Sequence, residues 1–305
     1  MKVHILGSGA GGGFPQWNCY CHNCDGFRKG KLHAKARTQS SIAISDKVGT
    51  NWILINASPD IRAQLLNAQA LQPARKVRDS AIDGVILVDS QIDHTTGLLM
   101  LREGNKLPLY CTQSVYEDLT TGFPIINILA SYCGTEFHEI KMGASNAFNI
   151  PSLPHIRFIA IALEGKAPPY SPHRQSPTVG DNIALFIHCE HSNKSLFYAP
   201  GLAKIDEVIF PWMQQADCLL LDGTFWQEDE MKVNDIADKP AASMGHLLQS
   251  GANGMINHLN KLPDKRKILI HINNTNPILD EDSAQRKELS QAGIEVAEDG
   301  MVISL

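Results

Sequence analysis

The sequence predicts a single α/β domain with a large antiparallel part. The 305 residues are 43% hydrophobic, enough to bury one large core. Strand-like and helix-like runs alternate in the first half and again near the end, whereas residues 134 to 200 contain only strand and loop patterns. No repeat, linker or low-complexity stretch divides the chain. We therefore expect one domain that spans residues 1–305.

Short apolar runs bounded by turn residues predict the strands of this domain. The expected strands cover residues 3–6, 52–55, 84–88, 107–111, 156–163, 182–188, 194–198, 218–221, 267–272 and 301–305. Helical patterns lie between some of them, at residues 95–102, 114–120, 203–214, 243–261 and 280–292. Residues 165–180 hold four prolines and form a long polar loop, which is either functional or a plain surface loop.

The charge and the apolar pattern exclude several classes of partner. The net charge is −5 and the isoelectric point about 6.2, so the sequence shows no basic footprint for nucleic acid. No apolar run is long enough to span a bilayer, and the N-terminal segment lacks the pattern of a signal peptide. We expect a cytoplasmic protein without a membrane span.

A glycine-rich turn follows the first predicted strand. Gly7, Gly9 and Gly12 fit the G-x-G-x-x-G spacing of a dinucleotide-binding turn. Such a turn needs a helix at its third glycine, but the next residues, GFPQWN, would stop a helix. The acidic residue expected about twenty positions further on is also missing. We expect these glycines to let the backbone turn tightly and pass close to a buried site.

Three clustered cysteines predict a structural zinc site. Cys19, Cys21 and Cys24 have the spacing C-x-C-x-x-C, and three thiolates at this spacing can close on one Zn²⁺. The chain has seven cysteines, and an odd number argues against a disulfide framework. The alternative is three loop cysteines that stay reduced. The fourth ligand is left open, with His22, His33 or a distant residue as options.

Polar side chains end three apolar strands. Asp93 and His94 follow the strand at 84–88, Asp222 follows 218–221, and His271 closes 267–272. Residues at strand ends can meet at one edge of a sheet, where carboxylate and imidazole groups bind metals. Each residue alone fits a structural polar role equally well, but together they predict a metal site.

Several motifs together resemble one known superfamily. The segments LGSGAGGG, DSQIDHTTG, DGTF, Gly245-His246 and IHINN resemble the metallo-β-lactamase superfamily, in the order of its tRNA-processing and phosphodiesterase branch. The resemblance covers the chain from Met1 to Leu305. The combination of GGGFPQWNCYCHNC, DSQIDH and HINNTNPIL is similar to the members that act in pyrroloquinoline quinone (PQQ) biosynthesis. The resemblance to the superfamily implies an αββα sandwich fold.

The sequence departs from this superfamily at its first metal site. The usual motif is H-x-H-x-D-H, but Asp89 and Gln91 stand here in place of the first two histidines. The matching stretch for the bridging aspartate, FYAPGL, has no carboxylate. Asp93, His94 and His271 remain. Two imidazoles and one carboxylate with open positions are the ligand set of non-haem Fe(II) oxygenases.

The resemblance and this ligand set together imply a reaction. We expect an Fe(II)- and O₂-dependent hydroxylase of the tyrosine-derived ring of a Glu-Tyr intermediate, with Mn, Mg or Zn able to replace iron in a crystal. The implied partners are a small or dipeptide-derived PQQ precursor, O₂ and PQQ itself as a bound product; a homodimer is left open. The alternatives are a soluble PQQ carrier or transport accessory, and a single-metal hydrolase.

The resemblance also suggests roles for the surrounding residues. Asp222 and His246 match an acid/base pair, with plain polar pairing as the alternative. Asp89 and Gln91 are expected to line the pocket and hydrogen-bond metal-bound water or a substrate phenol.

Further positions are expected to contact substrate or zinc. Arg174, Lys166 and Ser90 are candidates for binding the substrate carboxylates, and solvated surface charge is the alternative for the two cations. Asn274 occupies the position of the relatives' fourth zinc ligand, although asparagine binds zinc poorly.

Overall fold

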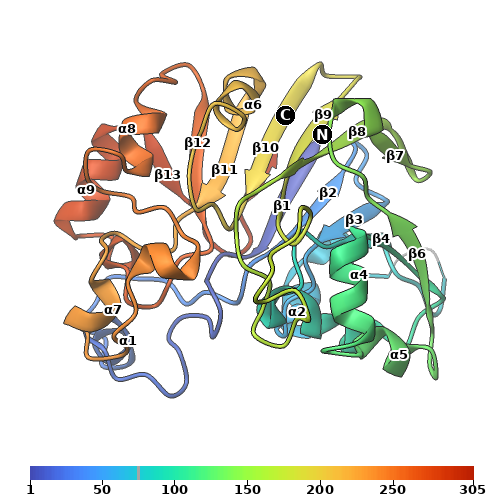
Figure 1. Cartoon of the computed structure of the whole chain (residues 1–305), viewed down its shortest axis with the longest axis horizontal. Helices are drawn as coiled ribbons and strands as arrows, with labels where there is room; N and C mark the ends of the chain where they lie inside the picture. The colour runs from blue at the N-terminus through green and yellow to red at the C-terminus, as the bar shows by residue number, and fades with distance from the viewer. Residues whose placement is uncertain (74–75) are drawn as a thin grey trace.

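The computed structural model describes residues 1–73 and 76–305, and its first sheet holds strands from the N-terminal half and the end of the chain (Figure 1). The spatial order of its seven strands is β14-β1-β2-β3-β4-β5-β6. These strands are β1 (Lys2–Gly7), β2 (Ser41–Ser45), β3 (Trp52–Ile55), β4 (Ile82–Ile86), β5 (Leu107–Cys111), β6 (Thr135–Glu139) and β14 (Val302–Ser304).

The second sheet holds the seven strands from the middle and the C-terminal half. Its spatial order is β13-β12-β11-β10-β9-β8-β7. The strands are β7 (Phe148–Ile150), β8 (Leu153–Ala162), β9 (Ile183–Cys189), β10 (Lys194–Ala199), β11 (Cys218–Asp222), β12 (Arg266–Ile270) and β13 (Ile294–Val296).

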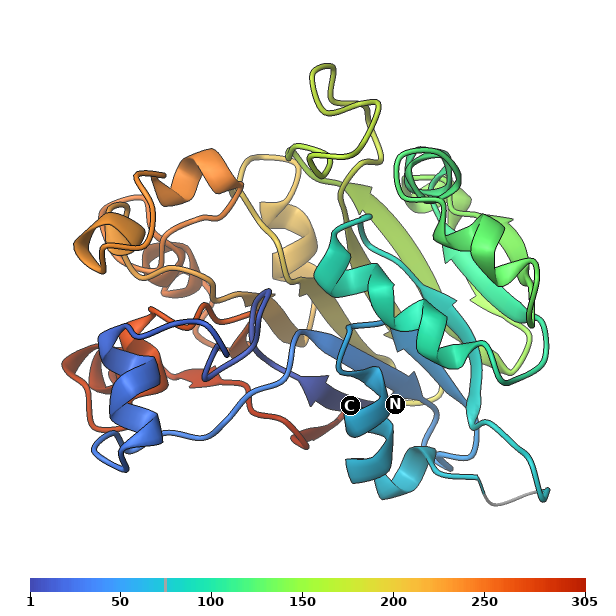
Figure 2. The same ribbon diagram turned by 90° about the horizontal axis from the view of Figure 1, so that it is seen from below.

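The helices are short and lie mostly outside the two sheets (Figures 1 and 2). They are α1 (His22–Arg28), α2 (Ile61–Asn67), α3 (Ile92–Thr95), α4 (Gln113–Thr120), α5 (Ile125–Leu129), α6 (Phe210–Gln215), α7 (Glu230–Val233), α8 (Met255–Leu259) and α9 (Ala284–Gln291). Each helix is too short or too polar to span a bilayer, within the described residues.

Three apolar clusters show how these layers pack. One joins the inner faces of both sheets, with residues such as Ile55 and Val88 from the first and Tyr198 from the second. A second packs the first sheet against α2, α4 and α5, and a third packs the second sheet against α6, α8 and α9. The strands are buried on both faces, which explains their continuous apolar runs. The predicted sandwich of helices, two sheets and helices is confirmed.

Each sheet has a parallel part, and these parts place the polar strand ends together. Strands β3 to β6 are parallel in the first sheet, as are β10 to β13 in the second. The loops after β4, β11 and β12 therefore leave the carboxyl edge of their sheets, where ligand sites of α/β proteins form.

Several predicted boundaries need correction. Strands β3 and β5 have the predicted bounds, but helix 243–261 is wrong except at α8, because Gly245 and Gly251 have positive φ values of 88° and 90°. The helix predicted at 95–102 is a short α3 followed by a 3₁₀ turn, η2 (Thr96–Leu101). Helix 203–214 shrinks to α6, which begins next to Pro211.

The glycine turn is not followed by a helix at its third glycine. The next helix, α1, begins only at His22. The turn instead pairs with the second sheet, since Ala10 N donates to Ile272 O at 2.9 Å and Ile272 N donates to Ser8 O at 3.0 Å. The glycines thus hold the first sheet to the segment that follows β12.

Candidate metal centre

Asp93, His94 and His271 converge between the ends of the two sheets. The Nε2 atom of His271 lies 3.3 Å from Oδ2 of Asp93, and Nε2 of His94 lies 3.9 Å from the same oxygen. The two imidazole centroids are 5.3 Å apart, edge to face. One ligand atom from each residue lies within 4.8 Å of the others, close enough to bind a single ion.

The loop after β4 fixes the first two of these side chains. The carbonyl of His94 accepts a 2.7 Å hydrogen bond from Ala57 N, and Gly97 N donates to Ala57 O at 2.9 Å. A Cβ atom at Gly97 would lie 2.1 Å from Ser58 O, so only glycine allows this close approach. Helix α3 is therefore anchored to the loop after β3, with Asp93 and His94 turned towards the second sheet.

His271 is held in an uncommon backbone conformation. Its φ is 60°, in the left-handed region, where a non-glycine residue costs about 1–3 kcal/mol. The hydroxyl of Thr224 lies 2.9 Å from both its Nδ1 and its carbonyl oxygen, and the next residue is bonded to Ser8. The surrounding bonds thus compensate for the strain and direct Nε2 towards Asp93.

The donor atoms fit a metal ion. Nδ1 of His94 is occupied by the carboxylate of Asp89, while its Nε2 is buried and has no hydrogen-bond partner among the described residues. A buried polar atom without a partner is unusual and calls for a ligand. Burial lowers the pKa of His94, but the charges of Asp89 and Asp93 outweigh it and raise this pKa to about 9. A strong field of negative charge thus surrounds the ring, which favours a cation.

A second cluster shares His271 with the first. Asp222, His246 and His271 also offer ligand atoms within 4.8 Å of one another. Nδ1 of His246 lies 2.7 Å from Oδ2 of Asp222, and its ring stacks on His271 with centroids 5.5 Å apart. Burial opposes ionisation of Asp222, but the charge of His246 outweighs it and keeps the pKa of Asp222 low. Its partner His246 has a raised pKa for the converse reason, because the charge of Asp222 overcomes the effect of burial.

The residues in place of the first-site histidines lie differently from the prediction. Asp89 is buried, and both its oxygens lie within 2.9 Å of His94 Nδ1. It therefore fixes the orientation of the His94 ring, whose other nitrogen is a candidate metal ligand. The side chain of Gln91 is half-buried beside the loop, and its backbone N donates to Asp89 at 2.9 Å.

The predicted substrate contacts are also placed differently. Ser90 is fully buried and donates a 2.5 Å hydrogen bond to Asp118, which leaves it no access to a substrate. Arg174 donates to the carbonyl of Ala167 at 2.6 Å, inside its own loop. Lys166 is exposed. The spacing of loop residues gave no information on where their side chains point.

The three clustered cysteines face Asn274. The Nδ2 atom of Asn274 lies 3.1 Å from the sulfur of Cys19, 3.6 Å from that of Cys21 and 3.4 Å from that of Cys24. The sulfurs form one group of candidate metal ligands. A hydrogen bond from Cys21 is the main reason why the pKa of Cys24 falls to about 7. The set offers three thiolates with Asn274 at the fourth corner.

A buried asparagine ties this loop to the segment after β12. Asn23, on α1, donates through Nδ2 to the carbonyls of Asn274 and Asn276, each at 3.0 Å. Figure 2 shows the blue helix α1 beside the red C-terminal part of the chain. The loop is therefore ordered by contacts of its own, besides the candidate zinc ligands. It contains a short helix with a specific anchor.

One residue of the centre was missed, as was a buried acid outside its two ligand clusters. Thr224 connects Asp222 to His271. Glu230 is 3% exposed and accepts hydrogen bonds from Thr275 Oγ1 at 2.5 Å and Trp226 N at 2.6 Å. Thr224 lies inside the DGTF segment, so its position after a strand-end aspartate was a usable signal. Glu230 lies in a polar stretch that gave none.

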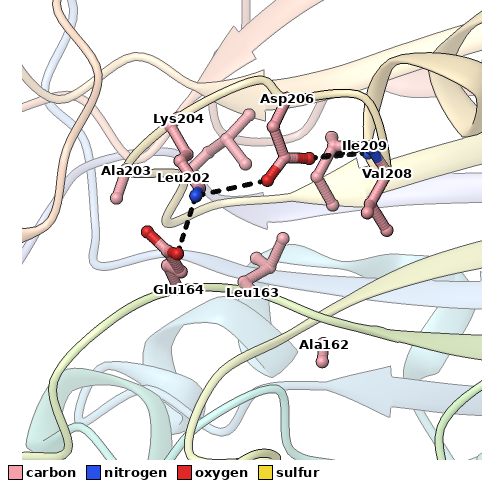
Figure 3. A pocket seen from close by; sticks show the side chains of 9 residues that line it. All are labelled: Ala162, Leu163, Glu164, Leu202, Ala203, Lys204, Asp206, Val208 and Ile209. Atoms are coloured by element: carbon pink, nitrogen blue, oxygen red, sulfur yellow. Dashed lines mark hydrogen bonds and ion pairs between the residues drawn. The ribbon is translucent and has the colours of Figure 1, made fainter.

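A small pocket of about 100 Å³ lies to one side of the centre (Figure 3). Its cation, Lys204, lies 2.6 Å from Glu164 and 3.4 Å from Asp206, so its charge is already paired. The neighbouring Leu202 links the pocket to the centre, because its backbone N donates to Asp222 at 2.8 Å. None of the candidate metal ligands lines it.

Comparison with known families and sequences gives consistent matches. A family model described as "Beta-lactamase superfamily domain" matches residues 51–272. The chain is 59% identical to coenzyme PQQ synthesis protein B of Ectopseudomonas mendocina and 57% identical to that of Pseudomonas aeruginosa strain LESB58. Each match covers the full length of both chains.

Solved structures agree with these matches. Zn²⁺-bound PqqB from Methylobacterium extorquens is 35% identical and superposes with a TM-score of 0.88 over the whole of both chains. A diphosphatase of the PhnP family is 20% identical with a TM-score of 0.66, over 99% of this chain and 96% of that one, and shows the same fold.

Proposed function

The chain belongs to the coenzyme PQQ synthesis protein B family within the β-lactamase superfamily, and from this membership we propose that it acts in PQQ biosynthesis as an iron- and O₂-dependent hydroxylase. Its substrate is the tyrosine-derived ring of a Glu-Tyr intermediate. The zinc bound by the M. extorquens relative supports metal binding in this chain as well.

One observation carries the choice of reaction. Asp93, His94 and His271 form a compact set of two imidazoles and one carboxylate, which is the ligand set of non-haem Fe(II) oxygenases. Asp89 occupies the place of a first-site histidine but is engaged by His94. The second cluster shares His271 with the first, and its His246 is engaged by Asp222, so we infer one centre with open positions rather than the metal pair of a binuclear hydrolase. Bound at this centre, Fe(II) would supply the activation of O₂.

The other residues would manage protons and orientation. The ring of His246 keeps Nε2 free because Nδ1 is bonded to Asp222, so Nε2 is the atom available to exchange a proton with a substrate phenol. Asp222 holds this ring in place and stabilises its protonated form. Asp89 fixes the ring of His94, and Arg174 and Lys166 are proposed to attract substrate carboxylates to the loop above.

The reaction has a defined balance. Conversion of a ring C–H into C–OH by one O₂ places one oxygen atom on the ring and releases the other as water. It consumes two electrons and two protons, so each hydroxylation requires a two-electron reductant such as a dithiol or ascorbate. Successive hydroxylations of one ring repeat this stoichiometry.

The test uses the full chain, loaded with Fe(II) without oxygen. The Glu-Tyr-derived substrate is added, then reductant and ¹⁸O₂, and the product is analysed by mass spectrometry. We expect ring products that carry ¹⁸O and elemental analysis that gives one zinc and one iron per chain. An iron-loaded protein that leaves the ring unoxidised would refute the hydroxylase. Turnover of generic esters with Zn²⁺ and no O₂ would instead establish the hydrolase, and tight PQQ binding without chemistry the carrier.

A further inference from the structure

Thr224 stands between the two clusters of the centre. It lies two residues after the end of β11 and is 3% exposed. Its hydroxyl oxygen is 2.6 Å from Oδ1 of Asp222 and 2.9 Å from Nδ1 of His271. One buried hydroxyl therefore contacts both the carboxylate that supports His246 and a candidate metal ligand.

Counting donors and acceptors decides which way the hydroxyl proton points. Asp222 already accepts hydrogen bonds from Leu202 N and His246 on one oxygen and from Thr224 N on the other. A carboxylate with this many donors is an acceptor only. The hydroxyl also lies 2.9 Å from His271 O, but the charged carboxylate of Asp222 at 2.6 Å is the stronger acceptor. The single proton of Thr224 is therefore donated to Asp222, and the hydroxyl oxygen is left to accept.

The orientation of the hydroxyl sets the protonation of the neighbouring imidazole. Because the Thr224 oxygen accepts, Nδ1 of neutral His271 must carry the proton and donate it. The lone pair is then on Nε2, the nitrogen that lies 3.3 Å from Asp93. A metal ligand needs this lone pair, and a hydrogen-bond acceptor at the other ring nitrogen makes it a stronger donor.

We propose that Thr224 is a positioning residue that fixes His271 in its metal-binding tautomer and links it to the Asp222–His246 pair. His94 has the equivalent support directly from Asp89. The proposal rests on the metal site of the proposed function but not on hydroxylation, since neither the tautomer nor the affinity for an ion involves oxidation of the substrate ring.

The first experiment measures the tautomer in metal-free protein. Two-bond ¹H–¹⁵N correlation spectra of ¹⁵N-histidine-labelled protein distinguish a protonated Nδ1 from a protonated Nε2, and His271→Ala identifies the signal of this residue. We expect the protonated Nδ1 form in the native protein and in Thr224→Ser, which keeps the hydroxyl. Thr224→Val has nearly the same shape and no hydroxyl, and we expect it to lose this preference.

The second experiment measures affinity for Co²⁺ alone, in protein whose cysteine site already holds one zinc. The visible bands of Co²⁺ report binding to nitrogen and oxygen ligands. We expect Thr224→Val to bind about 10- to 100-fold more weakly and Thr224→Ser to stay close to the native protein. Thr112→Val is the matched control, because it removes a buried hydroxyl that donates to Gly180 O at 2.7 Å and accepts from Val115 N at 3.3 Å, but that bonds none of the candidate metal ligands.

The outcomes separate this proposal from the proposed function. Thr224→Val with native Co²⁺ affinity and a protonated Nδ1 at His271 would overturn the role of Thr224. An equal loss of affinity in Thr224→Ser, or in Thr112→Val, would also overturn it, because the effect would then be one of general stability. A tautomer and affinity that respond as expected, in a protein that never hydroxylates the ring, would support Thr224 and refute the hydroxylase.

Discussion

Nδ1 of His94 lies 2.8 Å from Oδ1 and 2.9 Å from Oδ2 of Asp89. Both groups are buried, with His94 2% and Asp89 6% exposed. The carboxylate, which stands where the superfamily motif has a histidine, thus orients the ring of His94, a candidate ligand of the proposed centre. In the proposed site, the same residue accounts for the loss of one metal position and for the support of the other.

Asp89→Asn is expected to weaken metal binding. An amide can still contact the ring, but it lacks the charge that strengthens the imidazole as a ligand, so Co²⁺ affinity should fall about 10- to 100-fold. Titration followed by visible absorption measures this. Asp217→Asn serves as the control, since Asp217 bonds Ser195 and Lys194 at the start of β11, far from the carboxyl edge. Equal affinities for native protein and Asp89→Asn would contradict the orienting role.

His94→Ala is expected to separate chemistry from product binding. Removal of a ligand with a buried Nε2 should abolish ring hydroxylation, as followed by mass spectrometry. PQQ binding, measured by fluorescence quenching, should be largely kept if the pocket outside the metal survives. His155→Ala changes an exposed histidine and should leave both properties intact. Hydroxylation by His94→Ala at the native rate would remove this residue from the centre.

Cys24→Ser is expected to remove the structural zinc and to destabilise the chain. Cys24 is fully buried, and structural zinc sites contribute directly to folding. Elemental analysis should show one zinc fewer per chain, and thermal unfolding should begin at a lower temperature. Cys133→Ser changes a half-buried cysteine outside the cluster and should keep the native zinc content. If Cys24→Ser kept its zinc and its stability, the site would not be a zinc clip.

Glu230→Gln is expected to change how stability depends on pH. Burial raises the pKa of Glu230 from 4.5 to about 7, so the folded state binds a proton more tightly than the unfolded state. The resulting contribution to the free energy of unfolding is complete below pH 4.5. It is lost as the pH rises through 7, and it amounts to about 3 kcal/mol at most. Urea unfolding at several pH values measures it. Between pH 4.5 and pH 7 the free energy of unfolding of the native protein should fall relative to that of Glu230→Gln. If the free energies of the two proteins changed in parallel with pH, the raised pKa of Glu230 would be contradicted.

The sequence predicts the centre better than it predicts the helices. Asp93, His94, Asp222 and His271 each follow an apolar strand, and the pattern locates such strands well because their burial on both faces leaves only apolar residues. Strands β2, β6, β7 and β13 were missed, since β2 begins and ends in serine, β6 has a partly exposed polar sequence, and β7 and β13 have only three residues each.

Long-range contacts explain what the sequence could not predict. Helix 243–261 has an apolar pattern, but its glycines break the backbone, so tertiary context decides the outcome. The anchor of α1, from Asn23 to Asn274 and Asn276, joins positions more than 250 residues apart. Ser90 was expected to contact substrate, whereas its hydroxyl donates to Asp118, a partner 28 positions away that only the fold brings near.

The pairing of Asp93 with His271 has a consequence for how the chain matures. The two residues are 178 positions apart and come from different sheets, so the centre exists only after both sheets have docked. A nascent chain on the ribosome that has not yet exposed His271 cannot hold an ion there, whatever the metal supply. Metal capture at the proposed centre would therefore follow the docking of the two sheets, and a protein bearing the ion has already formed these long-range contacts.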